Sequence, residues 1–238
     1  MSEAGSALYD EPALAAAYAR VSAENAANAA YERPAVRALL AGVAGCDVLD
    51  AGCAAGEHAA WLAEHGARVT AVDASDAMLA LARERLGPRA RVLRADLAAP
   101  LPFADAAFDV VLSSLTMHYL RDWAPTLGEL ARVLRPGGRL VLSTHHPYMT
   151  VDPAADYHAV RLVADAWEGF APAPVAVRFY HRPLERIVAE VVGAGFALRG
   201  LHEPRPTAQA ERRDPRLAAR FRREPGFLIV EAVRAAAS

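Results

Sequence analysis

The strongest constraint on the fold is an alternation of β-prone apolar runs with segments of helical period, which begins near position 46. Strands joined by crossover helices are typical of a parallel sheet that is buried on both faces. Because such crossovers are right-handed, the alternation predicts an open α/β fold. The expected strands cover 47–52, 68–73, 91–96, 108–114 and 139–145, and the expected helices cover 57–65, 75–86 and 124–134.

The segments that flank this alternation follow other patterns. Residues 147–180 hold four prolines and show no clear period, which predicts a functional insertion rather than a plain connection. A helix that ends at Gly195 and two further strands are expected after it. The prediction is a single domain over 1–238, made of a helical cap (1–40), a core (46–146), an insertion or lid (147–180) and a C-terminal part (181–238). In the C-terminal part, the expected helix covers about 183–194 and the expected strands lie near 197–203 and 226–234.

Composition excludes several classes of protein. The net charge is −2, which favours neither nucleic acid nor an anionic membrane as a partner. The first thirty residues lack an unbroken apolar stretch, and no run of about 18 uncharged apolar residues occurs, so neither a signal peptide nor a membrane span is expected. Cys46 and Cys53 are the only cysteines, so we expect neither disulfides nor a metal site, and a cytoplasmic location. The arginine-rich link 205–223 is expected to be a solvated helical face, with a patch for an acidic partner as the alternative.

The turn after the first expected strand points to a ligand. In an open α/β sheet, ligands bind beyond the carboxyl ends of the strands. The stretch "VLDAGCAAGEHAAWL" (48–62) places Gly52 where backbone can approach a ligand closely and Gly56 where the next helix starts. Its spacing differs from that of a dinucleotide-binding G-x-G-x-x-G turn. Ala54 carries a side chain within this turn, and we therefore expect it at negative φ.

Two acids at consecutive strand ends indicate which ligand the turn holds. A carboxylate at Asp73, after the second strand, can accept hydrogen bonds from both hydroxyls of a ribose. Asp96, after the third strand, is placed to accept a hydrogen bond from the amine of an adenine. No P-loop lysine is present, so the set favours an adenosine ligand without a pyrophosphate.

These motifs make the chain resemble class I S-adenosylmethionine-dependent methyltransferases of the bacterial small-molecule type (methyltransferase type 11-like). "VLDAGCAAG", "VTAVDASDAML", "RADLAAPLPFADAAFDVVLSSLTMHYLRD" and "ELARVLRPGGRLVLSTHHP" look like the common blocks of that family. The resemblance implies a Rossmann-like α/β fold with a seven-stranded, mostly parallel sheet in the order 3-2-1-4-5-7-6. The last strand would be antiparallel, with helices on both faces and 46–146 as the cofactor-binding core. It also implies S-adenosylmethionine as cofactor and S-adenosylhomocysteine as product.

The resemblance further implies which residues hold the cofactor. Asp50 and the Gly52–Gly56 turn would hold the methionine part and Asp73 the ribose, whereas Asp96, Leu97 and Met78 would flank the adenine and Ser113 would lie beneath the sulfonium. Ala54 departs from the glycine that the family usually has there. The implied cofactor-binding residues are Asp50, Gly52, Cys53, Ala54, Gly56, Asp73, Ala74, Met78, Asp96, Leu97 and Ser113.

Candidates for catalysis and acceptor binding lie outside these motifs. Methyl transfer is an in-line displacement, so a base is needed only if the acceptor must lose a proton. His118, His145 and above all His146 follow the fourth and fifth strands and are the candidate bases, with a structural role as the alternative. Aromatic and polar residues of the cap and insertion are expected in the acceptor pocket, unless they are packing core. These residues are Tyr9, Tyr18, Tyr31, Tyr148, Tyr180 and His181, with Trp167 and Phe179 beside them.

The predicted function is transfer of a methyl group to an O or N atom of a small molecule, with bacterial secondary metabolism as the expected setting. The protein is expected to be a monomer or a homodimer. Residues 1–30 and 147–180 are expected to form a mobile cover that becomes ordered when both ligands are bound. Methylation of a peptide or RNA is one alternative, although RNA would need a basic groove. A non-catalytic S-adenosylmethionine-binding protein is the other.

Overall fold

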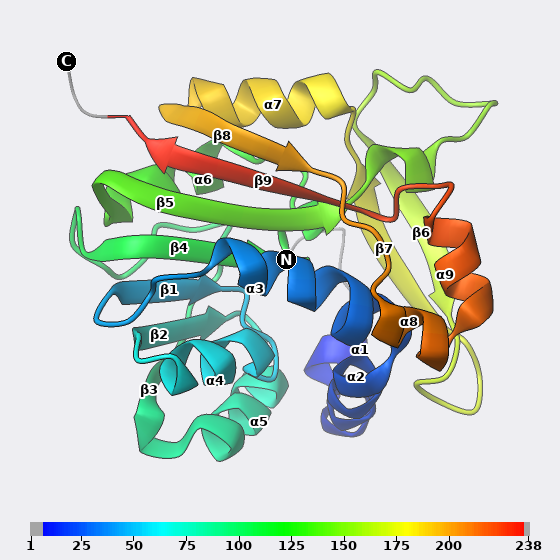
Figure 1. The fold of residues 1–238 in the computed structure, drawn as a ribbon, viewed down its shortest axis with the longest axis horizontal. Coiled ribbons are helices and arrows are strands. Elements are labelled where there is room, and N and C mark those ends of the chain that lie inside the picture. The colour runs from blue at the N-terminus through cyan, green and yellow to red at the C-terminus, as the bar shows by residue number, and fades with distance from the viewer. Residues whose placement is uncertain (1–6, 236–238) are drawn as a thin grey trace.

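A computed structural model describes residues 7–235 and contains a seven-stranded sheet. This sheet lies at the centre of the molecule (Figure 1). The strand order is β3-β2-β1-β4-β5-β9-β8, and β9 is antiparallel to both of its neighbours. Without the separate pair β6 and β7, this is the predicted order 3-2-1-4-5-7-6 with an antiparallel last strand, which is confirmed. The seven strands are β1 (Asp47–Ala51), β2 (Arg68–Asp73), β3 (Ala90–Arg94), β4 (Phe108–Ser114), β5 (Leu134–His145), β8 (Phe196–His202) and β9 (Phe227–Arg234).

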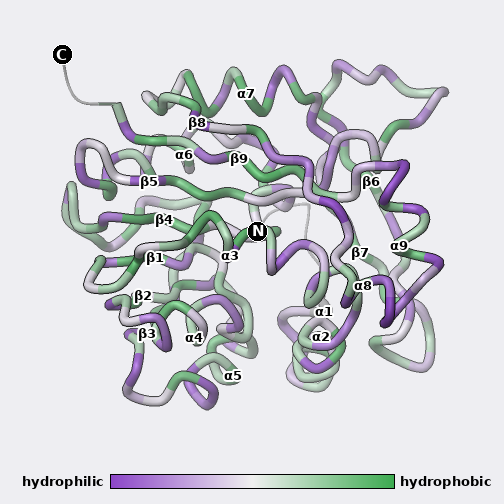
Figure 2. The backbone as a smooth tube through the Cα atoms, viewed as in Figure 1, coloured by the Kyte–Doolittle hydropathy of each residue, from purple (hydrophilic) through white to green (hydrophobic). Residues whose placement is uncertain are grey.

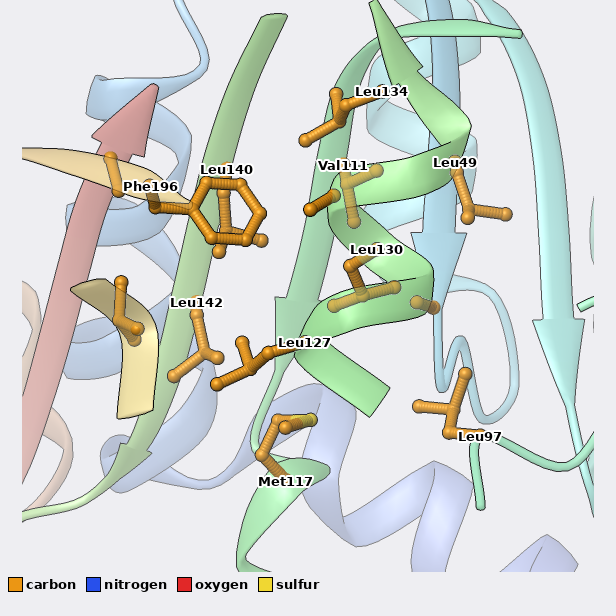
Figure 3. Close-up of a cluster of buried hydrophobic side chains, with 14 of the residues drawn as sticks. Leu49, Leu97, Val111, Met117, Leu127, Leu130, Leu134, Leu140, Leu142 and Phe196 are labelled. Atoms are coloured by element: carbon orange, nitrogen blue, oxygen red, sulfur yellow. The ribbon is translucent and has the colours of Figure 1, made fainter. Parts of the chain in front are cut away.

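Helices bury both faces of the sheet because the strands carry apolar side chains on each face. Leu62 and Leu79 pack with Val48 on one face, where α3, α4 and α5 lie. Leu127 and Ile187 pack with Leu49 on the other, where α6 and α7 lie (Figure 3). Figure 2 shows hydrophobic stretches along the strands, as expected for a sheet buried on both faces. The helices are α3 (Arg33–Leu39), α4 (Glu57–Glu64), α5 (Asp76–Leu86), α6 (Ala124–Val133) and α7 (Leu184–Gly193), with a 3₁₀ turn η2 (Gly87–Arg89) after α5.

The amino-terminal cap continues from α1 (Ala7–Asp10) and α2 (Pro12–Glu24) through a π-helical turn η1 (Asn28–Glu32) into α3. Residues 1–6 of the predicted cap lie outside the described residues. Ala15 and Ala19 of α2 pack with Met78 of α5, which holds the cap beside the carboxyl ends of the strands. Within residues 7–235, no helix is long and apolar enough to cross a lipid bilayer.

The insertion contains a β-hairpin that the sequence pattern did not predict. Strands β6 (Arg161–Trp167) and β7 (Val175–His181) pair antiparallel as a separate sheet. The short turn η4 (Pro147–Thr150) joins this hairpin to β5, and another short turn, η3 (Met117–Tyr119), follows β4. Only part of the hairpin is buried, so its sequence lacks the apolar runs of the central strands. The arginine-rich link is helical as predicted and forms α8 (Ala208–Arg213) and α9 (Pro215–Phe221).

Candidate functional site

A cavity of about 920 Å³ lies at the carboxyl ends of β1, β2 and β4. This volume is in the range of roughly 300–1,000 Å³ that is usual for small-molecule sites. Most of the residues expected to bind the cofactor line it, although they come from different parts of the chain. They are Asp50, Gly52, Cys53, Ala54, Asp73, Ala74, Met78, Asp96 and Leu97.

The turn after β1 has the backbone that a closely approached ligand requires. Gly52 has φ of 84°, and a Cβ on it would lie 2.3 Å from the Thr116 side chain. The N–H groups of Gly52 and Cys53 both donate to the carbonyl of Val72, which fixes the turn against β2. Another residue at position 52 would therefore clash and change the cavity wall.

The prediction of negative φ at Ala54 is wrong, because this residue lies in the left-handed region at φ of 46°. The backbone N–H of Ala54 donates a 2.8 Å hydrogen bond to Oδ2 of Asp73, which stabilises this conformation. The left-handed conformation costs a residue with a side chain about 1–2 kcal/mol. The hydrogen bond to Asp73 and the fixed turn outweigh the local preference of alanine.

Two of the expected cofactor residues, Gly56 and Ser113, are not among the residues that line this cavity. Gly56 precedes α4 with φ of 79°, and a Cβ on it would lie 3.2 Å from Leu86 of α5, so it permits close packing of the two helices. Ser113 is fully buried, and its Oγ has no hydrogen-bond partner in the described part of the chain. Its neighbour Ser114 and nearby Thr116 line the cavity instead.

The acidic residues of the cavity differ in their environments. Burial, helped by the charge of Asp73, raises the pKa of Asp50 to about 7. Burial also raises the pKa of Asp73, although the N–H groups of Ser75 and Ala54 donate to its carboxylate and oppose that shift. Asp96 is exposed and accepts a hydrogen bond of 2.9 Å from the Ala98 N–H. Asp73 is thus prearranged to accept further hydrogen bonds, whereas Asp96 lies at the open side of the site.

These features fit S-adenosylmethionine. The Oδ2 atom of Asp50 is buried without a partner among residues 7–235, so a donor from a ligand would satisfy it. Met78 and Leu97 are buried apolar side chains in the cavity wall and suit the two faces of a planar ring. Cys53 also lines the cavity, and burial raises the pKa of its thiol.

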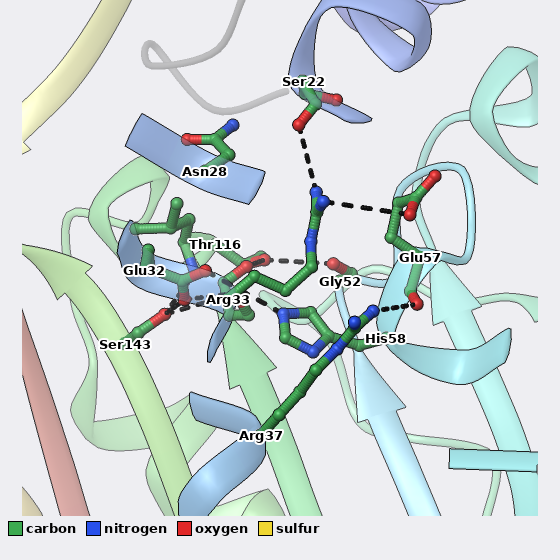
Figure 4. A network of polar contacts seen from close by, with 12 residues as sticks. Ser22, Asn28, Glu32, Arg33, Arg37, Gly52, Glu57, His58, Thr116 and Ser143 are labelled. Carbon is green, nitrogen blue, oxygen red and sulfur yellow. Dashed lines mark hydrogen bonds and ion pairs between the residues drawn. The ribbon is translucent and has the colours of Figure 1, made fainter. Parts of the chain in front are cut away.

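The cap supplies cavity residues that sequence reasoning missed. Glu32 and Arg33 are buried charged residues of the cavity wall, and His58 from α4 lies beside them (Figure 4). The signal available in the sequence was the adjacent pair Glu32 and Arg33 in an otherwise apolar, alanine-rich segment. Their position could not be predicted because it depends on a π-helical turn and on contacts with residues more than 80 positions away.

The buried His118 and the partly buried His145 form a stacked pair. Their ring centroids are 4.2 Å apart, and Phe179 of β7 packs edge-on against His145. Burial lowers the pKa of His145 to about 4, and it also lowers the pKa of His118. Neither ring nitrogen of His118 has a hydrogen-bond partner among the described residues. Both imidazoles are therefore neutral at pH 7 and lie beneath the hairpin, although they are not among the side chains that line the cavity.

His146 has a different environment from that pair. Its Nδ1 accepts the Tyr148 N–H at 3.0 Å, which caps the η4 turn, and its Nε2 lies 2.8 Å from a carboxylate oxygen of Glu203. Both ring nitrogens are thus engaged by the protein. The structure places His146 outside the cavity lining, so a catalytic role for it stays a prediction.

Of the residues expected to bind the acceptor, the structure brings Tyr9 and Tyr18 to the cavity. Their rings meet edge to face, and the Tyr9 hydroxyl lies 2.6 Å from that of Tyr119. The other candidates do not line the cavity. Tyr31 donates to the Pro204 carbonyl, Tyr148 is 51 % exposed, and Tyr180 is buried in the hairpin. His181 bonds to Thr150 and to the Tyr157 carbonyl, whereas Trp167 and Phe179 contact His145.

Comparisons with known proteins identify the family of the chain. A family model described as a methyltransferase domain matches residues 49–142. A malonyl-[acyl-carrier protein] O-methyltransferase of Pseudescherichia vulneris is 33 % identical over 193 residues, which are 72 % of this chain and 75 % of the relative. A demethylmenaquinone methyltransferase of Clavibacter sepedonicus is 39 % identical over 140 residues, covering 58 % of this chain and 56 % of the relative.

A solved structure agrees as well. The S-adenosylmethionine-dependent methyltransferase of Mesorhizobium loti superimposes with a TM-score of 0.69 at 33 % identity, over 85 % of this chain and 97 % of the other. The chain therefore belongs to the class I S-adenosylmethionine-dependent methyltransferases.

Proposed function

We propose that this methyltransferase transfers the cofactor's methyl group to an oxygen or nitrogen atom of a small molecule that binds between the cap and the hairpin. The observation that carries this proposal is that the cavity extends beyond the family motifs. The lining residues outside those motifs include Tyr18, Ser22 and Asn28 of the cap, and Ala176 and Arg178 of β7. These residues are not needed by the motifs expected to hold the cofactor, so they are available to a second, small ligand.

The sulfonium of S-adenosylmethionine, when bound, supplies a methyl group that is already activated for displacement. The protein's contribution is then alignment of the acceptor and exclusion of water. Leu115, which lines the cavity directly after β4, is held at φ of 50°, and its N–H donates to the Ser143 carbonyl. Strained backbone of this kind clusters at functional sites, which supports placing the acceptor here.

A base is required if the acceptor is a hydroxyl or a phenol that must lose its proton. His118, in η3 after β4, and His145, at the end of β5, are neutral and can accept a proton, although neither side chain lines the cavity. His146 is the weaker candidate, because Glu203 and the Tyr148 backbone engage both of its ring nitrogens. If the acceptor is a neutral amine, an imidazole need only orient its lone pair.

A second candidate is an acceptor tethered to a carrier protein. The Pseudescherichia vulneris relative is named for a malonyl group on an acyl-carrier protein. In this chain, the link between β8 and β9 holds seven arginines, and the side chains of Arg212 and Arg216 are exposed with no acidic partner among the described residues. Thr207 donates to the Ala30 carbonyl and Arg213 to the Glu24 carbonyl, so α8 lies against the cap.

The experiment is a turnover assay that measures S-adenosylhomocysteine release with a panel of acceptors. The panel contains a free malonyl thioester, the malonyl-carrier protein, a demethylated quinone, phenols, amines, a peptide mixture and RNA. We expect release that depends on one small acceptor, free or carrier-bound. Turnover with peptide or RNA alone would contradict the proposal. Cofactor binding without turnover on any acceptor would support the non-catalytic alternative.

A further inference from the structure

A buried carboxylate from the cap has one oxygen that the protein leaves available. Oε1 of Glu32 accepts hydrogen bonds from Ser143 Oγ at 2.6 Å and from Ser114 Oγ at 2.9 Å. The other oxygen, Oε2, lies 3.9 Å from Nε2 of His58, which is beyond hydrogen-bond distance. Glu32 is 1 % exposed and belongs to the cavity wall. Its free oxygen is therefore screened from bulk water yet next to the ligand space.

His58 cannot neutralise this carboxylate. Burial, aided by the charges of Arg33 and Arg37, lowers the pKa of His58 well below its ordinary value, so the imidazole is neutral. Burial raises the pKa of Glu32, while its serine partners and the two arginines oppose that shift. A cation that enters the cavity beside Oε2 would stabilise the ionised form.

The neighbouring residue Arg33 offers the opposite charge. Its guanidinium is largely buried, donates to the Ser22 carbonyl at 3.2 Å and lies 3.8 Å from Oε2 of Glu57. Glu57 is closely paired with Arg85, and Arg37 donates to its backbone carbonyl. Arg33 thus keeps guanidinium donors that the protein does not use, and Figure 4 shows it in front of the Gly52 turn.

These charges lie beside the ends of β4 and β5, because Ser114 and Ser143 donate to Glu32, and not at the ends of β2 and β3, where the acids that suit an adenosine lie. The wall here is made by Asp50, Gly52 and the residues that follow β4, whereas Asp73 and Asp96 follow β2 and β3. A cofactor whose adenosine lies at Asp73 can extend its amino-acid end from β2 toward the neighbouring strands β1 and β4. A zwitterion matches a free carboxylate oxygen beside free guanidinium donors.

We propose that Glu32 binds the α-ammonium group of the cofactor's methionine part and that Arg33 binds its α-carboxylate. The cap then completes the cofactor site, in addition to any role in binding the acceptor. This assignment depends on the cofactor alone and not on the identity of the acceptor.

The test compares two ligands on the wild-type protein and the Glu32→Gln variant by isothermal titration. S-adenosylhomocysteine carries the amino-acid group, and 5′-methylthioadenosine lacks it. Because Gln can still accept from both serines, the cap should stay docked, and the apo melting temperature should change little. We expect Glu32→Gln to weaken S-adenosylhomocysteine binding roughly 10- to 100-fold and to leave 5′-methylthioadenosine binding unchanged.

Equal weakening of both ligands would assign Glu32 a structural role only and overturn the proposal, as would unchanged affinity for both. Glu190→Gln is the matched control, since Glu190 is a buried carboxylate paired with Arg182 outside the cavity. It should leave the ratio of the two affinities unchanged. Arg33→Met should likewise weaken the binding of S-adenosylhomocysteine and leave the binding of 5′-methylthioadenosine unchanged.

A measurement on the wild-type protein decides the question even if the variant fails to fold. An S-adenosylhomocysteine analogue that lacks only the α-amino group should bind roughly 10- to 100-fold more weakly than the parent compound. Equal affinity of the two compounds would overturn the proposal.

Discussion

The backbone N–H of Ala54 donates to the carboxylate of Asp73, which joins the turn after β1 to the end of β2. Ala54 forms this bond at φ of 46°, where glycine is favoured. We expect Ala54→Gly to stabilise the protein by about 0.5–1 kcal/mol, since relief of the left-handed strain exceeds the extra entropy of an unfolded glycine. Urea unfolding measures this change.

Ala106→Gly provides the matched control, because Ala106 has φ of 53° in a loop away from the cavity. It should give a similar gain in stability. If Ala54→Gly instead destabilises the protein as a glycine in an ordinary helix does, the left-handed conformation at position 54 is not strained.

We expect Asp73→Ala to weaken S-adenosylhomocysteine binding by roughly 2–4 kcal/mol, since charged hydrogen bonds contribute about 1.5–3 kcal/mol each but add imperfectly. The variant loses the bonds that hold the turn as well as those expected from the ribose. Asp96→Ala should weaken the binding of S-adenosylhomocysteine by less than Asp73→Ala does, because Asp96 is exposed to water. Titration calorimetry compares the two, and an Asp73→Ala variant with wild-type affinity would contradict the ribose assignment.

The alternation of strands and helices was enough to predict the sheet and the edge at which the site lies. Gly52 directly follows β1 and Asp73 ends β2, so the positions of these residues depend on the local pattern. The φ of Ala54 could not be predicted, because the hydrogen bond to Asp73 spans 19 positions and overrides the alanine preference.

The residues of the cap and hairpin required long-range information. Glu32 reaches the cavity through hydrogen bonds to serines at the ends of β4 and β5, 82 and 111 positions away. Trp167 of the hairpin packs on His145, a pairing that no period in residues 147–180 encodes. Proximity to a strand end also pointed to His146, yet the cap of η4 and Glu203 engage its ring.

Asp50 predicts how the stability of the apo protein depends on pH. The carboxyl has a pKa of about 7 in the folded chain, against an ordinary value of 3.8, because it is buried. Between these pH values folding takes up a proton, so the contribution of Asp50 falls as the pH rises from about 4 to 7, by at most roughly 4 kcal/mol.

Asp50→Asn removes this titration. The free energy of unfolding of the variant minus that of wild type should therefore increase as the pH rises over that window. Urea unfolding at several pH values measures the difference. A difference that stays constant from pH 4 to 7 would show that Asp50 is already ionised in the folded protein.

His118→Ala and His145→Ala should lower turnover roughly 10²- to 10⁴-fold if the acceptor must lose a proton. His146→Ala, which keeps the stacked pair, should have a smaller effect. Because burial lowers the pKa of His145 to about 4, the acid limb of the rate profile should lie near that pH rather than near 6.5. Each variant must keep its affinity for S-adenosylhomocysteine, and full activity in all three would exclude these histidines as bases.

The exposed arginines of α8 and α9 predict how a carrier-bound acceptor would be recognised. Arg212→Glu with Arg216→Glu replaces two positive charges on the helices that lie against the cap. If the acceptor is tethered to an acidic carrier, the double variant should raise KM for the carrier-bound substrate, and added salt should reduce the difference from wild type. The values of kcat and of KM for the free thioester should not change, because neither arginine lines the cavity.

Arg199→Glu is the matched control, since Arg199 is exposed on β8 and should leave both KM values unchanged. An equal KM for the carrier-bound substrate in wild type and double variant would assign α8 and α9 no part in recognition, while the small-molecule function would stand.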